Sequence, residues 1–215
     1  MTTTAPVRRP TVGATSISFA RQSLAGLRVL VVLTVLLGLA YPLTVTGVSW
    51  LTMRWQANGS LLTADGARTT DPSHAVGSAL VGQVTDGPQW FHPRPSVAGD
   101  GYDTLASAGS NLGPNNPDLV ATITERRASV AAAEGVEPAA VPPDAVTASA
   151  SGLDPEISPQ YARLQVDRVA RENGLPRDRV AALVEAHVVG RDLGFLGEPR
   201  VNVLRLNLAL RTMAP

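Results

Sequence analysis

Histidine is the residue type of this sequence best suited to metal binding or acid–base chemistry, and only three are present, His74, His92 and His187. None has a partner at metal-ligand spacing, and neither an HExxH nor a GxSxG motif occurs. Cysteine is absent, which excludes disulfides and thiolate metal sites. We interpret His187 as a surface or packing residue. His92, in a segment rich in proline and aromatic residues, is the most site-like of the three, although the pattern favours a structural role.

Two loop segments could serve chemistry through backbone groups or a single carboxylate. Residues 108–117 are dense in Gly, Asn and Pro, and such a loop can present N–H groups to an anion. They lack the lysine and the strand–helix context of a P-loop, so we interpret them as an ordered loop. Asp154 lies in the turn sequence Ser-Gly-Leu-Asp-Pro, where its carboxylate can bond its own backbone. The residues by themselves therefore predict no catalytic centre.

The helices and strands that we expect to position these residues together indicate an α+β domain. Capping and breaker residues indicate helices over residues 117–134, 158–173 and 177–188. Apolar runs predict short strands at 78–84 and 146–150. Residues 201–210 leave two interpretations open, an alternating strand or a helix capped by Asn202. Because only nine aromatic residues are present, we expect a core of Val, Leu and Ala.

An uncharged stretch of 25 residues, Val29 to Met53, lies between Arg28 and Arg54. As a helix it would be about 37 Å long, enough to cross a hydrocarbon core of about 30 Å with some tilt. Four arginines and no acidic residue precede it, and positive residues near a span stay cytoplasmic. We therefore predict a disordered basic cytoplasmic tail at 1–27, a transmembrane helix at 28–54 and an extracytoplasmic α+β domain at 55–215.

The same stretch allows a cleaved signal peptide as an alternative, since a small-x-small triplet occurs at residues 38–40. Apolar residues continue beyond this triplet to Leu51, which favours a retained anchor. Pro42 predicts a kink in the helix. A ridge of residues spaced by four could let another membrane helix pack closely, or could reflect ordinary span composition. Its members are Thr34, Gly38, Pro42 and Thr46.

The region after the span is mildly acidic. From Trp55 onward 13 Arg stand against 18 Asp and Glu, a net charge of −5, and lysine is absent throughout. This gives no basic footprint for a nucleic acid, so we expect no nucleic-acid partner. The expected partner of the anchor is the lipid bilayer.

Several strings in one order make the chain similar to a known family. They are WQANGSL at 55–61, GSALVGQ at 77–83, FHPRPS at 91–96, GSNL at 109–112, VTASASGLD at 146–154 and VNVLRLNLAL at 201–210. On these residues the chain resembles the KdpC family, one of the component families of the bacterial Kdp potassium-transporting P-type ATPase. The N-terminal tail is longer, and Pro93 stands where glycine is expected. The candidates for family-signature or partner-contact residues are Gln83, His92, Arg94, Ser110, Asn111, Ser149, Ser151, Gly152, Leu153, Asp154, Asn202 and Asn207.

The resemblance implies an accessory, non-hydrolysing subunit in the bacterial cell membrane that supports assembly and pump activity. Its implied partners are a channel-like potassium-translocating subunit, a P-type ATP-hydrolysing subunit and a very small membrane subunit. The family is described as a catalytic chaperone that raises the ATP affinity of the hydrolysing subunit. A role for ATP is therefore implied by the family description only. An outer domain cannot touch cytoplasmic ATP, and no motif here marks a nucleotide site. We therefore expect no bound cofactor or metal.

Two other functions fit the residues. One is a stand-alone single-pass extracytoplasmic binding or sensor protein. The other is an anchored outer-surface hydrolase, which would need His92 and Asp154 in a convergent catalytic arrangement.

Overall fold

The computed structural model describes residues 12–213, and the chain divides into two compact units, Met1–Ala57 and Asn58–Pro215. Residues 1–11, part of the predicted tail, lie outside the described residues. The boundary between the units falls three residues after the predicted one.

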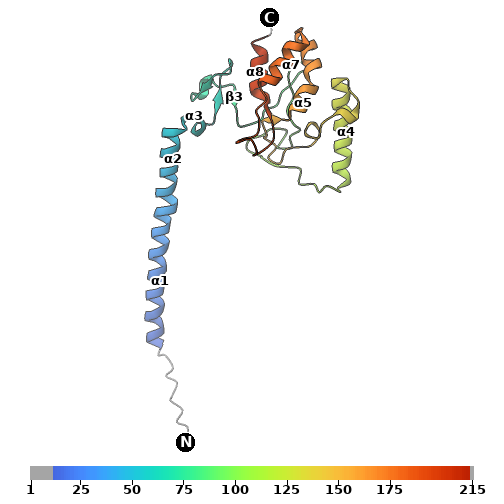
Figure 1. Ribbon diagram of the computed structural model, residues 1–215. Helices are drawn as coiled ribbons and strands as arrows, with labels where there is room; N and C mark the ends of the chain where they lie inside the picture. Colours follow the sequence, from blue (N-terminus) through green and yellow to red (C-terminus); the bar gives the residue numbers. More distant parts are fainter. Residues whose placement is uncertain (1–11, 214–215) are drawn as a thin grey trace. The chain divides into compact units, whose positions relative to one another are not determined.

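Within the described residues the first unit is helical and runs from blue to blue-green in Figure 1, with Met53 interrupting the helix before its last turn. It consists of α1 (Val12–Val35), a π-helical turn η1 (Leu36–Ala40), α2 (Tyr41–Thr52) and the short α3 (Arg54–Ala57). Residues 19–52 form a helix long and apolar enough to cross a membrane. The prediction of a disordered tail up to residue 27 is wrong from Val12 onward, because the helix extends that far. The helix end carries an exposed Trp50 ring with the Arg54 guanidinium 4.8 Å from its centroid.

Pro42 is accommodated by the π-helical turn that precedes it. Tyr41 N–H donates to the carbonyl of Leu36, five residues back, and Pro42 has no N–H to donate. The Thr44 hydroxyl donates to Ala40 O at 2.7 Å and occupies one of the carbonyls in this region. The structure thus has a π-helical turn next to the position of the predicted kink, and the kink itself stays a prediction. That turn interrupts the regular α-helical spacing of the ridge from Thr34 to Thr46, whose packing role stays a prediction.

The second unit contains very little sheet. Strands β1 (Leu61–Leu62), β2 (Arg68–Thr69) and β3 (Gly77–Ser78) form an antiparallel sheet in the order β2-β1-β3. Strand β4 (Glu156–Ile157) pairs antiparallel with β5 (Val201–Asn202). Among the described residues, each strand is two residues long, so the domain rests on helices and on loops that are bonded through side chains.

Two predicted strands are wrong. The strand expected at 78–84 ends at Ser78, because the chain turns there and Gly82 N–H donates to Leu153 O at 2.8 Å. A Cβ on Gly82 would lie 2.6 Å from the carbonyl oxygen of Asp154, so only glycine fits this crossing. The strand expected at 146–150 is irregular, because Thr147 and Ser149 donate their N–H groups to Pro143 O and Pro95 O instead of a ladder.

The predicted helices are confirmed, and side-chain caps explain where two of them begin. The helices are α4 (Pro117–Glu134), α5 (Pro159–Leu164), α6 (Val166–Asn173), α7 (Arg177–Ala186) and α8 (Val203–Arg211). The side chains of Asn116 and Ser158 accept N–H bonds from the first turns of α4 and α5. The helix expected over 158–173 is divided at Gln165. Single 3₁₀ turns occur at η2 (Pro72–His74), η3 (Pro138–Ala140) and η4 (Pro143–Ala145).

The ambiguous last segment is a two-residue strand followed by a helix. Asn202 caps α8 by accepting from Arg205 N–H at 3.1 Å, as the helix alternative predicts. Leu206, Leu208 and Leu210 are all buried, which a period of two would also give, so the helical backbone of Val203–Arg211 and its Asn202 cap identify the segment as a helix. The strand interpretation is wrong beyond Asn202.

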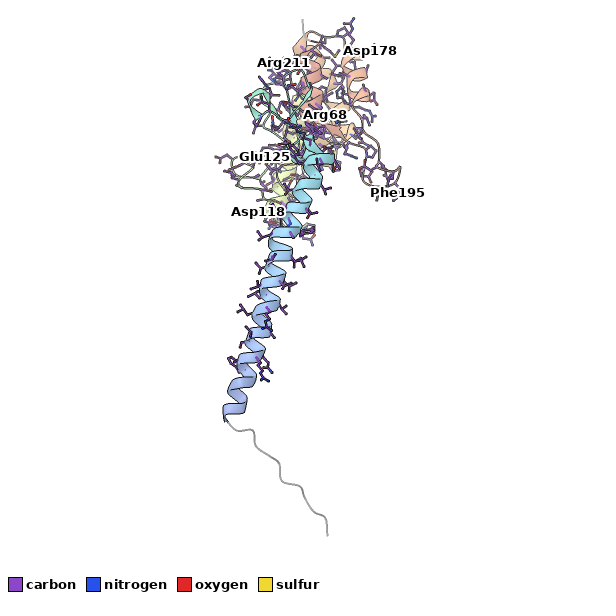
Figure 2. All side chains as sticks on the ribbon, turned by 90° about the vertical axis from the view of Figure 1, so that its left-hand side faces the viewer. Arg68, Asp118, Glu125, Asp178, Phe195 and Arg211 are labelled. Atoms are coloured by element: carbon purple, nitrogen blue, oxygen red, sulfur yellow. The ribbon has the colours of Figure 1, made fainter. Side chains whose placement is uncertain are left out.

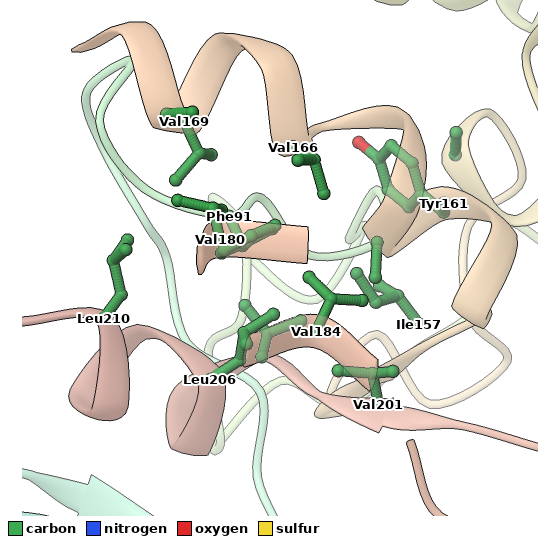
Figure 3. Close-up of a cluster of buried hydrophobic side chains, with 14 of the residues drawn as sticks. Phe91, Ile157, Tyr161, Val166, Val169, Val180, Val184, Val201, Leu206 and Leu210 are labelled. Carbon is green, nitrogen blue, oxygen red and sulfur yellow. The ribbon is translucent and has the colours of Figure 1, made fainter. Parts of the chain in front are cut away.

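The core lies between α5, α6, α7 and α8 (Figure 3), while α4 runs along one side of the domain (Figure 1). It is built mainly from Val, Leu and Ala, as the aromatic-poor composition predicts, with one fully buried Phe91. The labelled members are Phe91, Ile157, Tyr161, Val166, Val169, Val180, Val184, Val201, Leu206 and Leu210. Phe91 belongs to the segment from which the candidate site is built.

Candidate functional site

Residues 87–96, here called the strap, begin with a turn at 87–90 and then cross the domain in extended form at 91–96 without belonging to a strand. Pro88, Pro93 and Pro95 remove backbone donors and disfavour helix, which explains the extended form. Phe91 inserts its ring into the core and so draws the backbone inward. Backbone polar groups that are buried without a ladder need other partners.

Side-chain amides supply those partners to two successive residues. Asn207 of α8 accepts from Phe91 N–H and donates to Phe91 O, both at 2.9 Å. Gln165, between α5 and α6, accepts from His92 N–H at 2.6 Å and donates to His92 O at 3.1 Å. Each amide thus imitates the two-bond exchange of an antiparallel strand partner. Gln165 is fully buried, and its loss would leave both groups of His92 unpaired.

A buried arginine completes this network. Arg168 of α6 is 3% exposed and donates to Trp90 O at 2.9 Å, to Pro88 O, and to Gln165 Oε1 at 2.8 Å. Its charge is balanced by Glu134 at the end of α4, with Nε 2.9 Å from Oε1. Burial raises the pKa of Glu134, and the Arg168 guanidinium partly opposes that rise. Removing one member of such a pair costs about 3–5 kcal/mol, because the other charge is left buried and unpaired.

His92 is engaged in structure. Its Nε2 lies 3.0 Å from Gly87 O, so this nitrogen carries the proton and donates to the carbonyl. Burial is the main cause that lowers the pKa of His92, and the Arg168 charge lowers it further. The neutral ring thus closes the turn at the start of the strap.

Arg94 and Asp154 join the strap to the turn at 151–155. Arg94 Nη1 donates to Asp154 Oδ2 at 3.0 Å, and Asp154 Oδ1 accepts from Glu156 N–H at 3.0 Å. The Tyr102 hydroxyl donates to Arg94 O at 2.6 Å, and burial raises the pKa of Tyr102 to about 12, which keeps the donor protonated. Arg94 borders two open hollows of about 370 and 590 Å³. The pair is therefore the polar border between two depressions of the surface.

The turn at 149–153 is fitted closely against the end of the strap. Ser96 Oγ donates to Gly152 O at 2.6 Å, and Ser149 N–H donates to Pro95 O at 3.3 Å. Gly152 has φ +69°, and a Cβ there would lie 2.7 Å from the Cβ of Ala98. The Ser107 hydroxyl donates to Ser151 O at 2.8 Å. These contacts explain why a serine- and glycine-rich turn stands at this position.

The remaining predicted residues lie apart from this cluster. Ser110 and Asn111 are exposed in the loop at 99–116, where Asn111 has φ +53°. The Gln83 side chain lies against Gly77, and Asn202 donates its amide to Ala79 O at 2.8 Å besides capping α8. Leu153, half-buried, contributes its carbonyl to Gly82. The structure thus gathers His92, Arg94, Ser149 to Asp154 and Asn207 along the strap, and leaves the loop residues outside.

The reasoning from sequence missed the residues that hold the strap. They are Tyr102, Glu134, Gln165, Arg168 and Asn173, the last of which donates its amide to Gln89 O at 2.7 Å. A signal existed for two of them. Gln165 and Arg168 lie three residues apart and next to the apolar positions Val166 and Val169, so they share the buried face of the helix.

The polar side chains gathered along the strap are engaged with the backbone or with each other. Within residues 12–213 no group of three or more His, Asp or Glu could hold a metal ion. The side chains best suited to acid–base work bond the backbone, and the arginines pair with carboxylates. The chain thus consists of an apolar helix followed by a small domain, in which buried polar side chains bond the backbone and stabilise the fold.

Comparison with known proteins gives the family. The family model described as "K+-transporting ATPase, c chain" matches residues 23–212, and the chain belongs to this family, KdpC. A Kineococcus radiotolerans protein named potassium-transporting ATPase KdpC subunit is 56% identical over 195 residues, 91% of this chain and 95% of the relative. Proteins of the same name from Beijerinckia indica and Mycobacterium tuberculosis are 50% and 52% identical, over 86% and 88% of this chain and 91% and 97% of theirs. The resemblance seen in the sequence is confirmed.

Replacing Gln165 by Ala should lower the free energy of unfolding by about 2–5 kcal/mol, because both backbone groups of His92 and one Arg168 donor lose their partner. Gln160, exposed on α5, is the matched control, and Gln160→Ala should change stability by less than about 0.5 kcal/mol. Chemical denaturation of the full chain in detergent measures both. Equal stabilities of the two variants would show that the strap does not depend on this amide.

His92 should make stability depend on pH. Its folded-state pKa is lowered from the ordinary value of about 6.5, so the unfolded chain binds more protons between the two values. The stabilisation is complete above about pH 7 and is lost as pH falls below about 6.5 toward the lowered pKa. His92→Gln, which keeps a donor near Gly87 O, should flatten the profile between about pH 7.5 and 5.5. A variant profile parallel to the wild type would contradict this assignment.

Proposed function

We propose that this chain is an accessory, non-hydrolysing subunit of an ATP-driven potassium-uptake complex, which supports assembly and pump activity. The single observation that carries the proposal is how the family's matching residues are used. Where the structure groups them, they bond backbone or pair with each other, as His92, Arg94, Asp154 and Asn207 do. Residues whose side chains stabilise the fold are what we expect in a subunit that presents a fixed surface to its partners. That the complex is a potassium-transporting ATPase is inferred from the names of the relatives.

The partners in this proposal are a channel-like potassium-translocating subunit, a P-type ATP-hydrolysing subunit and a very small membrane subunit. The apolar helix at 19–52 would dock in the bilayer against one of them. Its π turn and Pro42 leave a region without regular backbone bonding, where small side chains allow close approach. The ridge of Thr34, Gly38, Pro42 and Thr46 is the proposed contact.

The domain belongs outside the cytoplasm in this proposal. Arginines without acids precede the helix, and the region after it has a net charge of −5. A domain placed there would brace or cover the outer mouth of the potassium pathway, where its charge modestly favours cations within about 8–10 Å. The raised ATP affinity described for the family would then act through the hydrolysing subunit, without direct contact between this domain and ATP.

A second candidate is a stand-alone extracytoplasmic binding protein. The observation that favours it is the pair of hollows, about 370 and 590 Å³, that meet at Arg94. This function requires a chain that is stable and active by itself.

Co-purification separates the two functions. Expressed with the other subunits of its complex, the tagged chain should bring down large polytopic partners, and its deletion should abolish potassium uptake. Asp154→Ala should reduce the amount of assembled complex about fivefold, the effect of roughly 1 kcal/mol, while uptake per complex stays unchanged. Asp178→Ala, on the exposed start of α7, is the control. The accessory function would be refuted if the chain purified alone and potassium uptake remained complete after its deletion. If the Asp154→Ala complex assembled but lost turnover, a hydrolase would be favoured.

Topology is tested by a single cysteine. The chain has no cysteine and Ser110 is exposed, so Ser110→Cys gives one reactive thiol without background. A membrane-impermeant thiol reagent should label it in intact spheroplasts as fully as after lysis. Labelling only after lysis would place the domain in the cytoplasm and restore direct contact with ATP as an explanation.

A further inference from the structure

An exposed hairpin of the domain, residues 189–200, carries apolar side chains at its end and is called here the apolar finger. Its tip residues Leu193, Phe195 and Leu196 are 83%, 69% and 49% exposed. Figure 2 shows Phe195 on a segment that projects from the rest of the domain. Single exposed apolar residues are ordinary, but three together on one turn form a patch that usually marks an interaction site.

Backbone hydrogen bonds and ion pairs order the finger, as an anchor for binding requires. Val189 and Arg200 exchange both backbone bonds at 2.8 and 2.9 Å, and Asp192 and Leu196 exchange theirs at 2.9 Å each. Ion pairs between Arg191 and Glu198 and between Arg200 and Asp192, at 2.6 and 3.1 Å, lie along its sides. A tip ordered before binding loses little conformational entropy on association.

Leu193 has a backbone conformation that the fold alone does not favour. Its φ is +52°, in the left-handed region that Gly, Asn and Asp adopt most readily, and Gly194 follows at +83°. Because the side chain is 83% exposed, it recovers little of this strain by packing inside the domain. A leucine here is explained if its side chain is buried against another molecule.

The charges of the finger favour a protein over a lipid surface. Arg191, Asp192, Glu198 and Arg200 sum to zero, and each is paired within the domain. Binding to an anionic membrane relies on unpaired Lys or Arg, and interfacial anchoring on Trp or Tyr, and residues 189–200 offer neither. A symmetric contact with a second copy would bury only this small tip against itself, whereas a socket on another protein can surround all three side chains.

We propose that the apolar finger inserts Leu193, Phe195 and Leu196 into an apolar socket on the outer face of a polytopic membrane subunit of the complex. This rests on the proposed function, which supplies such a subunit on the same side of the membrane. The three side chains form the compact apolar centre of the contact, and the ion pairs at its sides form a polar rim.

The test places a photo-crosslinking p-benzoylphenylalanine at Phe195 of the full chain, co-expressed with the complex in membranes. The control position is Val120, 55% exposed on α4. Irradiation should give an adduct with a polytopic subunit at residue 195 in a yield about tenfold above that at residue 120. In parallel, Leu193→Gly should leave the thermal stability of the chain unchanged or raised, because it relieves strain, yet shorten the lifetime of the purified complex about tenfold.

The outcomes are separable. An intact complex with no adduct at residue 195, an adduct of twice the chain's mass, or equal yields at both positions would overturn the finger contact while leaving the proposed function standing. An unchanged complex lifetime for Leu193→Gly would overturn it as well. Failure of the wild-type chain to co-purify with any polytopic subunit would instead remove the proposed function.

Discussion

The strap at residues 87–96 carries backbone polar groups into the domain where no sheet can pair them, and the structure depends on satisfying them. Asn207, Gln165 and Arg168 reach its carbonyl and N–H groups from α8, from the junction of α5 and α6, and from α6. Glu134 then ties α4 to the same arginine. One segment thus links helices that are distant in sequence. Each unmade bond would cost about 1–3 kcal/mol, which makes the network an all-or-none element of the fold.

The same constraint gives structural partners to the residues that look most reactive in the sequence. His92 closes a turn through Gly87 O, and Arg94 and Asp154 join the strap to the turn at 151–155. Groups fixed by such bonds give a domain with one shape and a defined surface. The features that remain open to solvent include the hollows beside Arg94 and the exposed tip at Leu193 and Phe195, which we propose as a contact for a partner. A family of transport-complex subunits can use such a surface for assembly.

The sequence predicts well whatever depends on neighbours in the chain. Asn116, Ser158 and Asn202 cap helices because each side chain reaches an N–H two or three residues away. The apolar span follows from composition, and the π turn follows from Pro42, which lacks a donor. The predicted strands at 78–84 and 146–150 are wrong because a local apolar run does not ensure that a second strand lies beside it to pair with. There the backbone bonds to Leu153 and Pro95 instead.

By itself the sequence determined the apolar helix, the capped helices, the core composition and the strings that identify the family. Only the tertiary structure decided what the family's residues do. Arg168 has the sequence context of an ordinary charged helix residue, yet it is 3% exposed and bonds segments 34 and about 80 positions away. Such pairings depend on how helices pack, and neither propensity nor periodicity carries that information. The sequence did not reveal the apolar finger either, because the exposure of a side chain is set by how the chain folds.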